Sequence, residues 1–115
     1  MEYEELPEFS RELKRLSKKY LSLGDDLDGL KQTLAKFSVS SGGKHWNCLH
    51  RDESMCVYKI RLACRYLRAT TMRVIYAQYT DSARIVFIEL YYKGDKENED
   101  RERIAQYMRS RMERN

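Results

Sequence analysis

The sequence lacks any hydrophobic run that approaches the length of a membrane span, and its acidic start, Met1–Glu5, is unlike a signal peptide. We therefore expect a cytoplasmic protein that does not insert into a membrane. The chain has only three cysteines, Cys48, Cys56 and Cys64. An odd number of cysteines in a reducing compartment predicts free thiols and excludes a disulfide framework.

Two catalytic signatures are also absent. The chain has no glycine-rich phosphate loop of the P-loop type and no His-Glu-x-x-His motif. The spacing of four potential zinc ligands matches no zinc pattern, although they lie within twelve residues: His45, Cys48, His50 and Cys56. A helix start, which favours negative charge, explains the acidic cluster of residues 95–100. We therefore expect no metal and no cofactor.

No internal repeat or low-complexity segment interrupts the 115 residues, a length that suits a single domain spanning residues 1–115. The chain has 22 Lys plus Arg against 18 Asp plus Glu, for a formal net charge of +4. This excess is uneven, because residues 1–40 sum to −1, residues 41–92 to +4 and residues 93–115 to +1. Positive charge concentrated in the predicted strand region favours a nucleic-acid partner.

Apolar residues at helical spacing predict two N-terminal helices. Pro7 opens the first helix and Gly24 ends it, and Asp25 and Asp26 begin the second. Their apolar stripes consist of Phe9, Leu13, Leu16 and Tyr20, and of Leu27, Leu30, Leu34 and Phe37. The short gap between them predicts a tight αα-hairpin that packs on a sheet.

β-Branched residues in alternation predict three strands, at about residues 56–64, 70–79 and 83–92. A loop covers Ser38–Ser54, and Thr80–Ser82 forms a tight hairpin turn. Ile85–Tyr92 is apolar enough to be a central strand buried on both faces. A last helix begins at about Glu99. The predicted fold class is α+β: an N-terminal αα-hairpin packed on a small, mostly antiparallel sheet, with a C-terminal helix.

Cationic residues recur on the predicted strands. Lys59 and Arg61 are two residues apart, so they share one face of their strand, and Arg73 on the next strand adds a third cation. A phosphate backbone is the natural ligand of such a group, and small ribonucleases need cations where negative charge builds on the phosphorane oxygens. Lys93 and Lys96 follow the last strand and are further candidate RNA-binding residues. For any single one of these residues, a solvated sheet face is the simpler interpretation.

The predicted loop contributes three more candidate RNA-binding residues, His45, Trp46 and His50. Histidine titrates near neutrality, so His45 or His50 can serve in acid–base catalysis; the alternative is a pair of exposed loop histidines with no special role. Trp46 can stack on a base of single-stranded RNA, or it can cap the core beside the hairpin.

Four segments, taken in chain order, carry a family resemblance: Phe9–Leu27, Tyr58–Leu62, Met72–Tyr76 and Ile88–Asn98. Together they resemble the RelE/ParE superfamily of type II toxin–antitoxin toxins over nearly the whole chain. The resemblance implies a RelE-like α+β domain that enters the ribosomal A site and cuts mRNA without metal, by attack of the ribose 2′-hydroxyl on the adjacent phosphate. In that picture Arg61 and Arg73 bind the phosphorane, and Lys59 is a base or a charge stabiliser. A cognate antitoxin would neutralise the toxin in a hetero-oligomer, as a helix or strand over the apolar hairpin or an open sheet edge.

The general acid is unassigned. The best-known members of the superfamily carry a catalytic tyrosine or histidine near the C-terminus, whereas no histidine follows His50 here. Tyr91 and Tyr92 come early for that role, and Tyr107 lies within the last predicted helix. Other branches of the superfamily poison DNA gyrase without nuclease activity, which gives a second interpretation of the chain as a binding module. A third is a non-toxic RNA- or protein-binding relative of the same fold.

Overall fold

A computed structural model describes residues 2–36, 46–80 and 82–113. Within these ranges the protein is an α+β fold with three helices and a five-stranded mixed sheet. In chain order the elements are β1 (Glu2–Glu5), α1 (Pro7–Ser17), α2 (Leu23–Lys36), β2 (Trp46–Arg51), β3 (Met55–Cys64), β4 (Ala69–Tyr79), β5 (Arg84–Tyr92) and α3 (Arg101–Glu113). The predicted α+β class is confirmed, with a strand rather than a helix at the N-terminal start.

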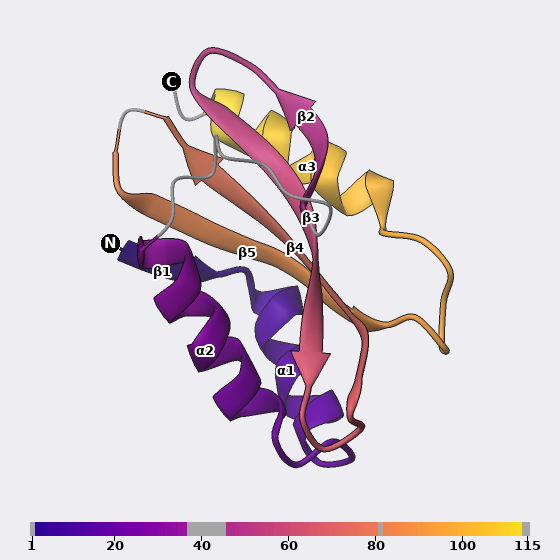
Figure 1. Cartoon of the computed structure of the whole chain (residues 1–115). Coiled ribbons are helices and arrows are strands. Elements are labelled where there is room, and N and C mark those ends of the chain that lie inside the picture. The colour runs from indigo at the N-terminus through magenta and orange to yellow at the C-terminus, as the bar shows by residue number, and fades with distance from the viewer. Residues whose placement is uncertain (1, 37–45, 81, 114–115) are drawn as a thin grey trace.

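The strands lie in the order β1-β5-β4-β3-β2. β1 runs parallel to β5, and the other neighbouring strands are antiparallel. Helices α1 and α2 cover one face of this sheet and α3 lies on the other (Figure 1). The parallel strand β1 was missed by the sequence analysis because four mostly exposed residues give too short an alternation to recognise. None of the described helices is long and apolar enough to span a membrane.

The helical hairpin has the predicted core but a different boundary. α1 begins at Pro7 and buries Phe9 and Leu16, as expected. The predicted stop at Gly24 is wrong, because α2 already begins at Leu23, which is 0% exposed. Burial of Leu23 favours the earlier start and outweighs the roughly 1 kcal/mol that a glycine costs in a helix. Phe37 lies outside the described residues.

The predicted loop between the hairpin and β3 is also wrong over Trp46–Arg51. These residues form the edge strand β2, which pairs antiparallel with β3 through a bulge between Cys48 and His50. This polar, irregular segment has no regular alternation, so its sequence does not predict a strand. It forms a strand because it pairs with β3. The segment 37–45, which includes His45, lies outside the described residues.

Strands β3, β4 and β5 agree with the sequence analysis to within a residue or so. β5 has a neighbour on each side and is buried on both faces, as predicted for Ile85–Tyr92. The apolar residues divide into two clusters, one on each face of the sheet. The hairpin side holds Tyr58, Ile60, Leu62, Met72, Val74 and Phe87 with the helical leucines, and the α3 side holds Met55, Val57, Ile75, Ala77, Val86, Ile88, Tyr91 and Ile104.

Candidate functional site

The three predicted strand cations share the α3 side of the sheet. On β3, Tyr58, Ile60 and Leu62 point into the hairpin-side core, so the alternating residues Lys59 and Arg61 face the other way. On β4, Arg73 lies between Met72 and Val74, which also face the hairpin. The predicted common face of Lys59, Arg61 and Arg73 is therefore confirmed, and we refer to this surface, with the residues that border it, as the cationic face.

Arg61 and Arg73 occupy directly opposed positions of the β3–β4 ladder. Opposed residues have Cβ atoms only about 5 Å apart, and like charges at such positions destabilise a sheet. Arg73 is 8% exposed and donates from Nη1 to the carbonyl oxygen of Met72 over 3.1 Å, whereas Arg61 is exposed. Burial and the nearby Arg61 charge lower the pKa of Arg73. The pair therefore brings two guanidinium groups close together on this face, which raises the positive potential there.

Lys59 does not point freely into solvent. Its Nζ donates to Oε2 of Glu99 over 3.1 Å, and the Glu99 side chain is only 2% exposed. Burial alone would raise the pKa of Glu99. Hydrogen bonds from its own backbone N–H and from Lys59, and the charge of Arg101, outweigh burial and hold this pKa below its ordinary value. Glu99 is therefore a carboxylate at neutral pH, and it holds the Lys59 side chain in an ion pair.

A second carboxylate reaches the same face through a bulge in β5. Ile75 pairs with Glu89 but the next residue of β4, Tyr76, pairs with Phe87, so Ile88 is the extra residue. The bulge turns Glu89 toward α3, where its oxygens accept from Lys96 Nζ and, over 2.7 Å, from the backbone N–H of Asp100. Glu89 is 0% exposed. The sequence does carry a signal for this site, because Glu89 is a single carboxylate in an otherwise apolar strand. Glu89 was not among the predicted site residues.

Of the two lysines predicted after the last strand, Lys96 borders the cationic face. Its Nζ pairs with Glu89 and lies 5.1 Å from the ring centroid of Tyr91. Lys93 is exposed and contributes its backbone N–H to the carbonyl of Thr71. The turn between them needs a glycine, because a Cβ at Gly94 would lie 2.3 Å from the Tyr92 ring.

Tyr91 is the tyrosine placed beside the arginine pair. It is opposite Arg73 in the β4–β5 ladder and is 4% exposed. Burial, followed by the charges of Glu99 and Glu89, raises the pKa of Tyr91 to about 12, so its phenol keeps its proton at neutral pH. Tyr92 faces the hairpin and packs against the ring of Tyr20, with centroids 5.4 Å apart.

Tyr107 is also engaged elsewhere. Its hydroxyl lies 2.5 Å from that of Tyr79, and burial and this contact raise its pKa. Tyr107 therefore links α3 to β4 instead of facing the arginine pair.

Of the candidates from the predicted loop, His50 does not join this group. His50 is on β2, where Nε2 lies 3.2 Å from Oδ2 of Asp52. It pairs with Val57, four residues before Arg61, which is a separation of roughly 13 Å along the strand. Trp46 pairs with Ile60 through its backbone, and His45 lies outside the described residues. The structure therefore gives His50 a partner, Asp52, but no place beside the arginines.

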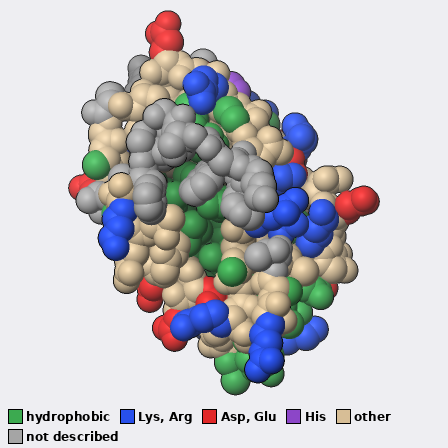
Figure 2. All heavy atoms as spheres, in the orientation of Figure 1, with side chains coloured by type: hydrophobic (Ala, Val, Ile, Leu, Met, Phe, Trp, Pro, Cys, Tyr) green, Lys and Arg blue, Asp and Glu red, His purple; other side chains and the backbone are tan. Residues whose placement is uncertain are grey.

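The cationic face carries Lys59, Arg61, Arg73 and Lys96 together with the carboxylates Glu89 and Glu99, and Arg101 pairs with Glu99 at its border. Figure 2 shows Lys and Arg side chains gathered on the right of the molecule, where Figure 1 has β3 and the start of α3. In residues 2–36, 46–80 and 82–113, no group of three or more His, Cys, Asp or Glu side chains is placed to hold a metal ion. All three cysteines are free.

Neither a protein-family model, nor a curated protein, nor a solved structure matches this chain. The functional argument therefore rests on the geometry of the cationic face.

Proposed function

We propose that this chain is the toxin of a type II toxin–antitoxin module, with a RelE-like domain that cleaves mRNA on the ribosome. The observation that carries the proposal is the opposed pair Arg61 and Arg73 on one sheet face. Two guanidinium groups held side by side on one sheet face are placed to bind the oxygens of a single phosphate. The helical hairpin, the antiparallel strands β2 to β5 and the C-terminal helix are consistent with this domain type.

Cleavage would proceed by attack of a ribose 2′-oxygen on the adjacent phosphorus, with loss of the hydroxyl proton. A new O2′–P bond forms, the P–O5′ bond breaks, and the 5′-oxygen takes up a proton. Arg61 and Arg73 would hold the non-bridging oxygens, where charge accumulates in the transition state. Lys59 adds positive charge from its pair with Glu99. Tyr91, protonated at neutral pH and opposite Arg73, is a nearby group with a proton to give.

The antitoxin of this proposal has a place to bind next to the cationic face. β2 pairs with β3 only as far as Ile60, and no described strand pairs with β3 beyond that residue on this side. The open edge borders a groove of about 810 Å³ that is closed on its other side by α2 around Gly29, where an added Cβ would meet nothing within 4 Å. An extended antitoxin segment added to this edge would lie against Arg61, which lines the groove.

Induced expression of the chain alone in a sensitive bacterial host tests the proposal. We expect growth arrest, loss of labelled amino-acid incorporation, and new mRNA 5′ ends within codons occupied by ribosomes, while plasmid supercoiling is preserved. Loss of supercoiling with continued protein synthesis would instead identify a gyrase-inhibiting binding module. Normal growth at full expression would contradict both toxin assignments and leave a non-toxic binding protein.

Replacement of Glu99 by glutamine is expected to strengthen RNA binding. The isosteric amide removes the negative charge that competes with a phosphate for Lys59. We expect roughly fivefold tighter binding of an uncleavable 2′-O-methyl RNA, equivalent to about 1 kcal/mol, by fluorescence anisotropy. The matched control is Glu102→Gln, which removes an exposed carboxylate paired with Arg109 on α3. Weaker binding by the Glu99 variant would contradict this competition and show that Glu99 is needed to hold Lys59 in place.

A further inference from the structure

The turns at the lower end of the molecule in Figure 1 carry two large apolar side chains that are exposed. Leu21 is 70% exposed and lies in the turn between α1 and α2, and Tyr66 is 56% exposed and lies between β3 and β4. The two turns are 45 residues apart in sequence, yet the backbone N–H of Tyr66 donates to Oγ of Ser22 over 2.8 Å. Leu21 and Tyr66 therefore belong to one surface formed by both turns.

A buried carboxylate fixes the two turns to each other. Asp26 is 7% exposed and accepts from Ser22 Oγ over 2.7 Å. It also accepts from the backbone N–H of Arg65 over 3.2 Å and from Arg65 Nε over 3.0 Å. A buried carboxylate with this many donors is well satisfied and holds its partners in place. The exposure of Leu21 and Tyr66 is therefore a feature of an ordered surface and not of a loosely attached loop.

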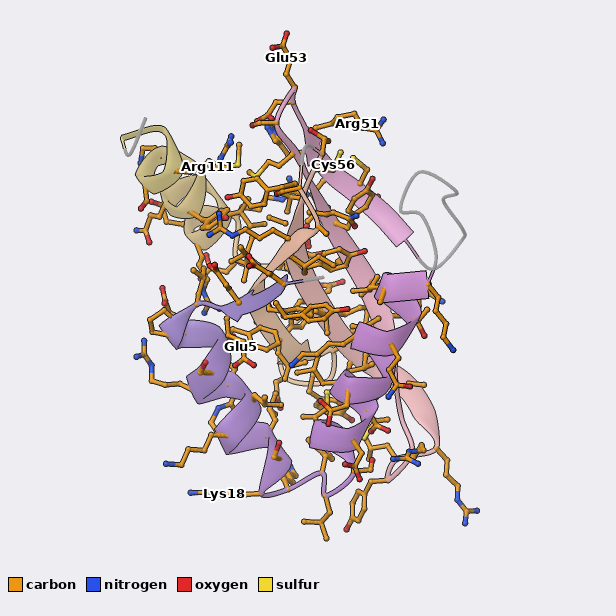
Figure 3. The ribbon with its side chains drawn as sticks, turned by 90° about the vertical axis from the view of Figure 1, so that its left-hand side faces the viewer. Glu5, Lys18, Arg51, Glu53, Cys56 and Arg111 are labelled. Carbon is orange, nitrogen blue, oxygen red and sulfur yellow. The ribbon has the colours of Figure 1, made fainter. Side chains whose placement is uncertain are left out.

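The same end of the molecule carries a ring of exposed cations, namely Lys18, Lys19, Arg65 and Arg68. Arg65 lies 3.8 Å from the exposed carboxylate of Asp25, and Arg68 adopts a left-handed backbone with φ of 53°. Figure 3 shows Lys18 at the foot of α1 with its side chain directed away from the body. In Figure 2 green and blue side chains alternate over this lower end. We call Lys18, Lys19, Leu21, Tyr66 and Arg68 the tip surface.

Strands β3 and β4 connect the tip surface to the cationic face. Arg61 is on β3 five residues before Tyr66, and Arg73 is on β4 five residues after Arg68. At about 3.3 Å per residue, each separation is at most about 17 Å along the chain, which a few nucleotides can span. One RNA strand bound at the arginine pair can therefore reach the tip surface.

We propose that the tip surface is a second RNA contact, in which Tyr66 stacks on an unpaired base while Lys18, Lys19 and Arg68 bind the neighbouring phosphates. This inference rests on the proposed function, since it extends the RNA bound at the cationic face. An exposed aromatic ring among cations is the usual arrangement for unstacked bases. Leu21 widens the apolar platform next to the ring. A protein partner would also bind the apolar side chains Leu21 and Tyr66, but it would give the neighbouring cations no role.

The decisive experiment compares three replacements of Tyr66. The side chain is exposed, and each replacement keeps the backbone N–H that donates to Ser22. The probe is a fluorescein-labelled, unstructured 12-nucleotide RNA, 2′-O-methylated throughout, in 50 mM salt. Tyr66→Ala and Tyr66→Leu are each expected to bind at least fivefold more weakly than the parent, and Tyr66→Phe to bind as the parent does. Parent-like binding by Tyr66→Leu would overturn base stacking and indicate an apolar protein contact.

A salt titration tests the phosphate contacts. The double variant Lys18→Ala/Lys19→Ala is expected to lower the slope of log K against log salt by about 1.4, at about 0.7 for each phosphate contact of a single strand. The matched control is Arg11→Ala/Lys36→Ala, which removes two exposed cations of α1 and α2 that lie farther from the tip. An equal slope for the two double variants would overturn the proposed contacts.

Failure of this inference and failure of the proposed function are distinguishable with one further variant. If Arg61→Ala loses RNA binding while Tyr66→Ala and the Lys18/Lys19 variant bind as the parent does, the tip inference is wrong and the proposed function stands. If all of these variants bind as the parent does, or if the parent binds no RNA, both are wrong.

Discussion

Replacing Arg73 with alanine is expected to abolish growth arrest and to lower the rate of mRNA cleavage on translating ribosomes by a factor of about 100 to 1,000. That is the range observed when one donor to a developing oxyanion is removed. The effect should be large because Arg73 is 8% exposed and held by its strand, so the charge is already in position when the phosphorane forms. Single-turnover cleavage of ribosome-bound mRNA, followed by 5′-end mapping, measures it.

Two companion variants separate chemistry from folding. Arg61→Ala removes the exposed member of the pair, which does not contribute to the core, and should show a similar loss of cleavage with a melting temperature equal to or above the parent's, because it also removes the like-charge contact with Arg73. Arg15→Ala removes an exposed arginine from α1, on the opposite side of the sheet, and should leave cleavage intact. A toxin that stays fully active with both Arg61 and Arg73 replaced would contradict the assignment of the cationic face.

The cationic face illustrates what alternation in a strand can predict. Period-two spacing is enough to place Lys59 and Arg61 on the face opposite Ile60, and a short connection to an antiparallel strand brings Arg73 beside them. Both inferences need only local sequence. The αα-hairpin followed for the same reason, since Pro7 and the apolar stripes of α1 and α2 are local signals.

The parts that were missed depend on residues far apart in the chain. Glu99 pairs with Lys59 across 40 residues, and no local pattern indicates that a carboxylate after β5 folds back onto β3. The bulge that turns Glu89 toward α3 depends on the register between β4 and β5. Strands β1 and β2 lie at the two edges of the sheet, and each is formed by pairing with a neighbour rather than by its own composition.

Replacing Glu12 with alanine is expected to cost about 2–3 kcal/mol of unfolding free energy. β1 pairs with β5 only up to Phe87, and beyond that point the edge of β5 is capped by side chains. Glu12 on α1 accepts from the backbone N–H of Leu90 over 3.1 Å, and Arg103 on α3 donates to the carbonyl of Ile88 over 3.0 Å. The two side chains also bind each other bidentately, at 2.8 and 2.9 Å, so they join the helices on opposite faces around the sheet edge.

The cost of losing Glu12 exceeds that of an ordinary surface pair because both side chains are only about one-sixth exposed and each also binds backbone. For a chain of this size the expected loss corresponds to roughly 10 °C in melting temperature, measurable by circular dichroism. Glu12→Gln keeps an acceptor for Leu90 and should fall between the parent and alanine, while Arg11→Ala, at an exposed neighbour, should stay within about 0.5 kcal/mol.

A double-mutant cycle then decides whether Glu12 and Arg103 act together. If they cap the edge of β5 as one unit, Glu12→Ala/Arg103→Ala will cost less than the sum of the single replacements by about 1 kcal/mol or more. Strict additivity would mean that each side chain binds its backbone group independently. Because α3 begins just after Glu99, which competes with a phosphate for Lys59, loosening this cap should, like Glu99→Gln, tighten RNA binding at the cationic face. A destabilised Glu12 variant with unchanged RNA affinity would show that the cap supports the fold alone.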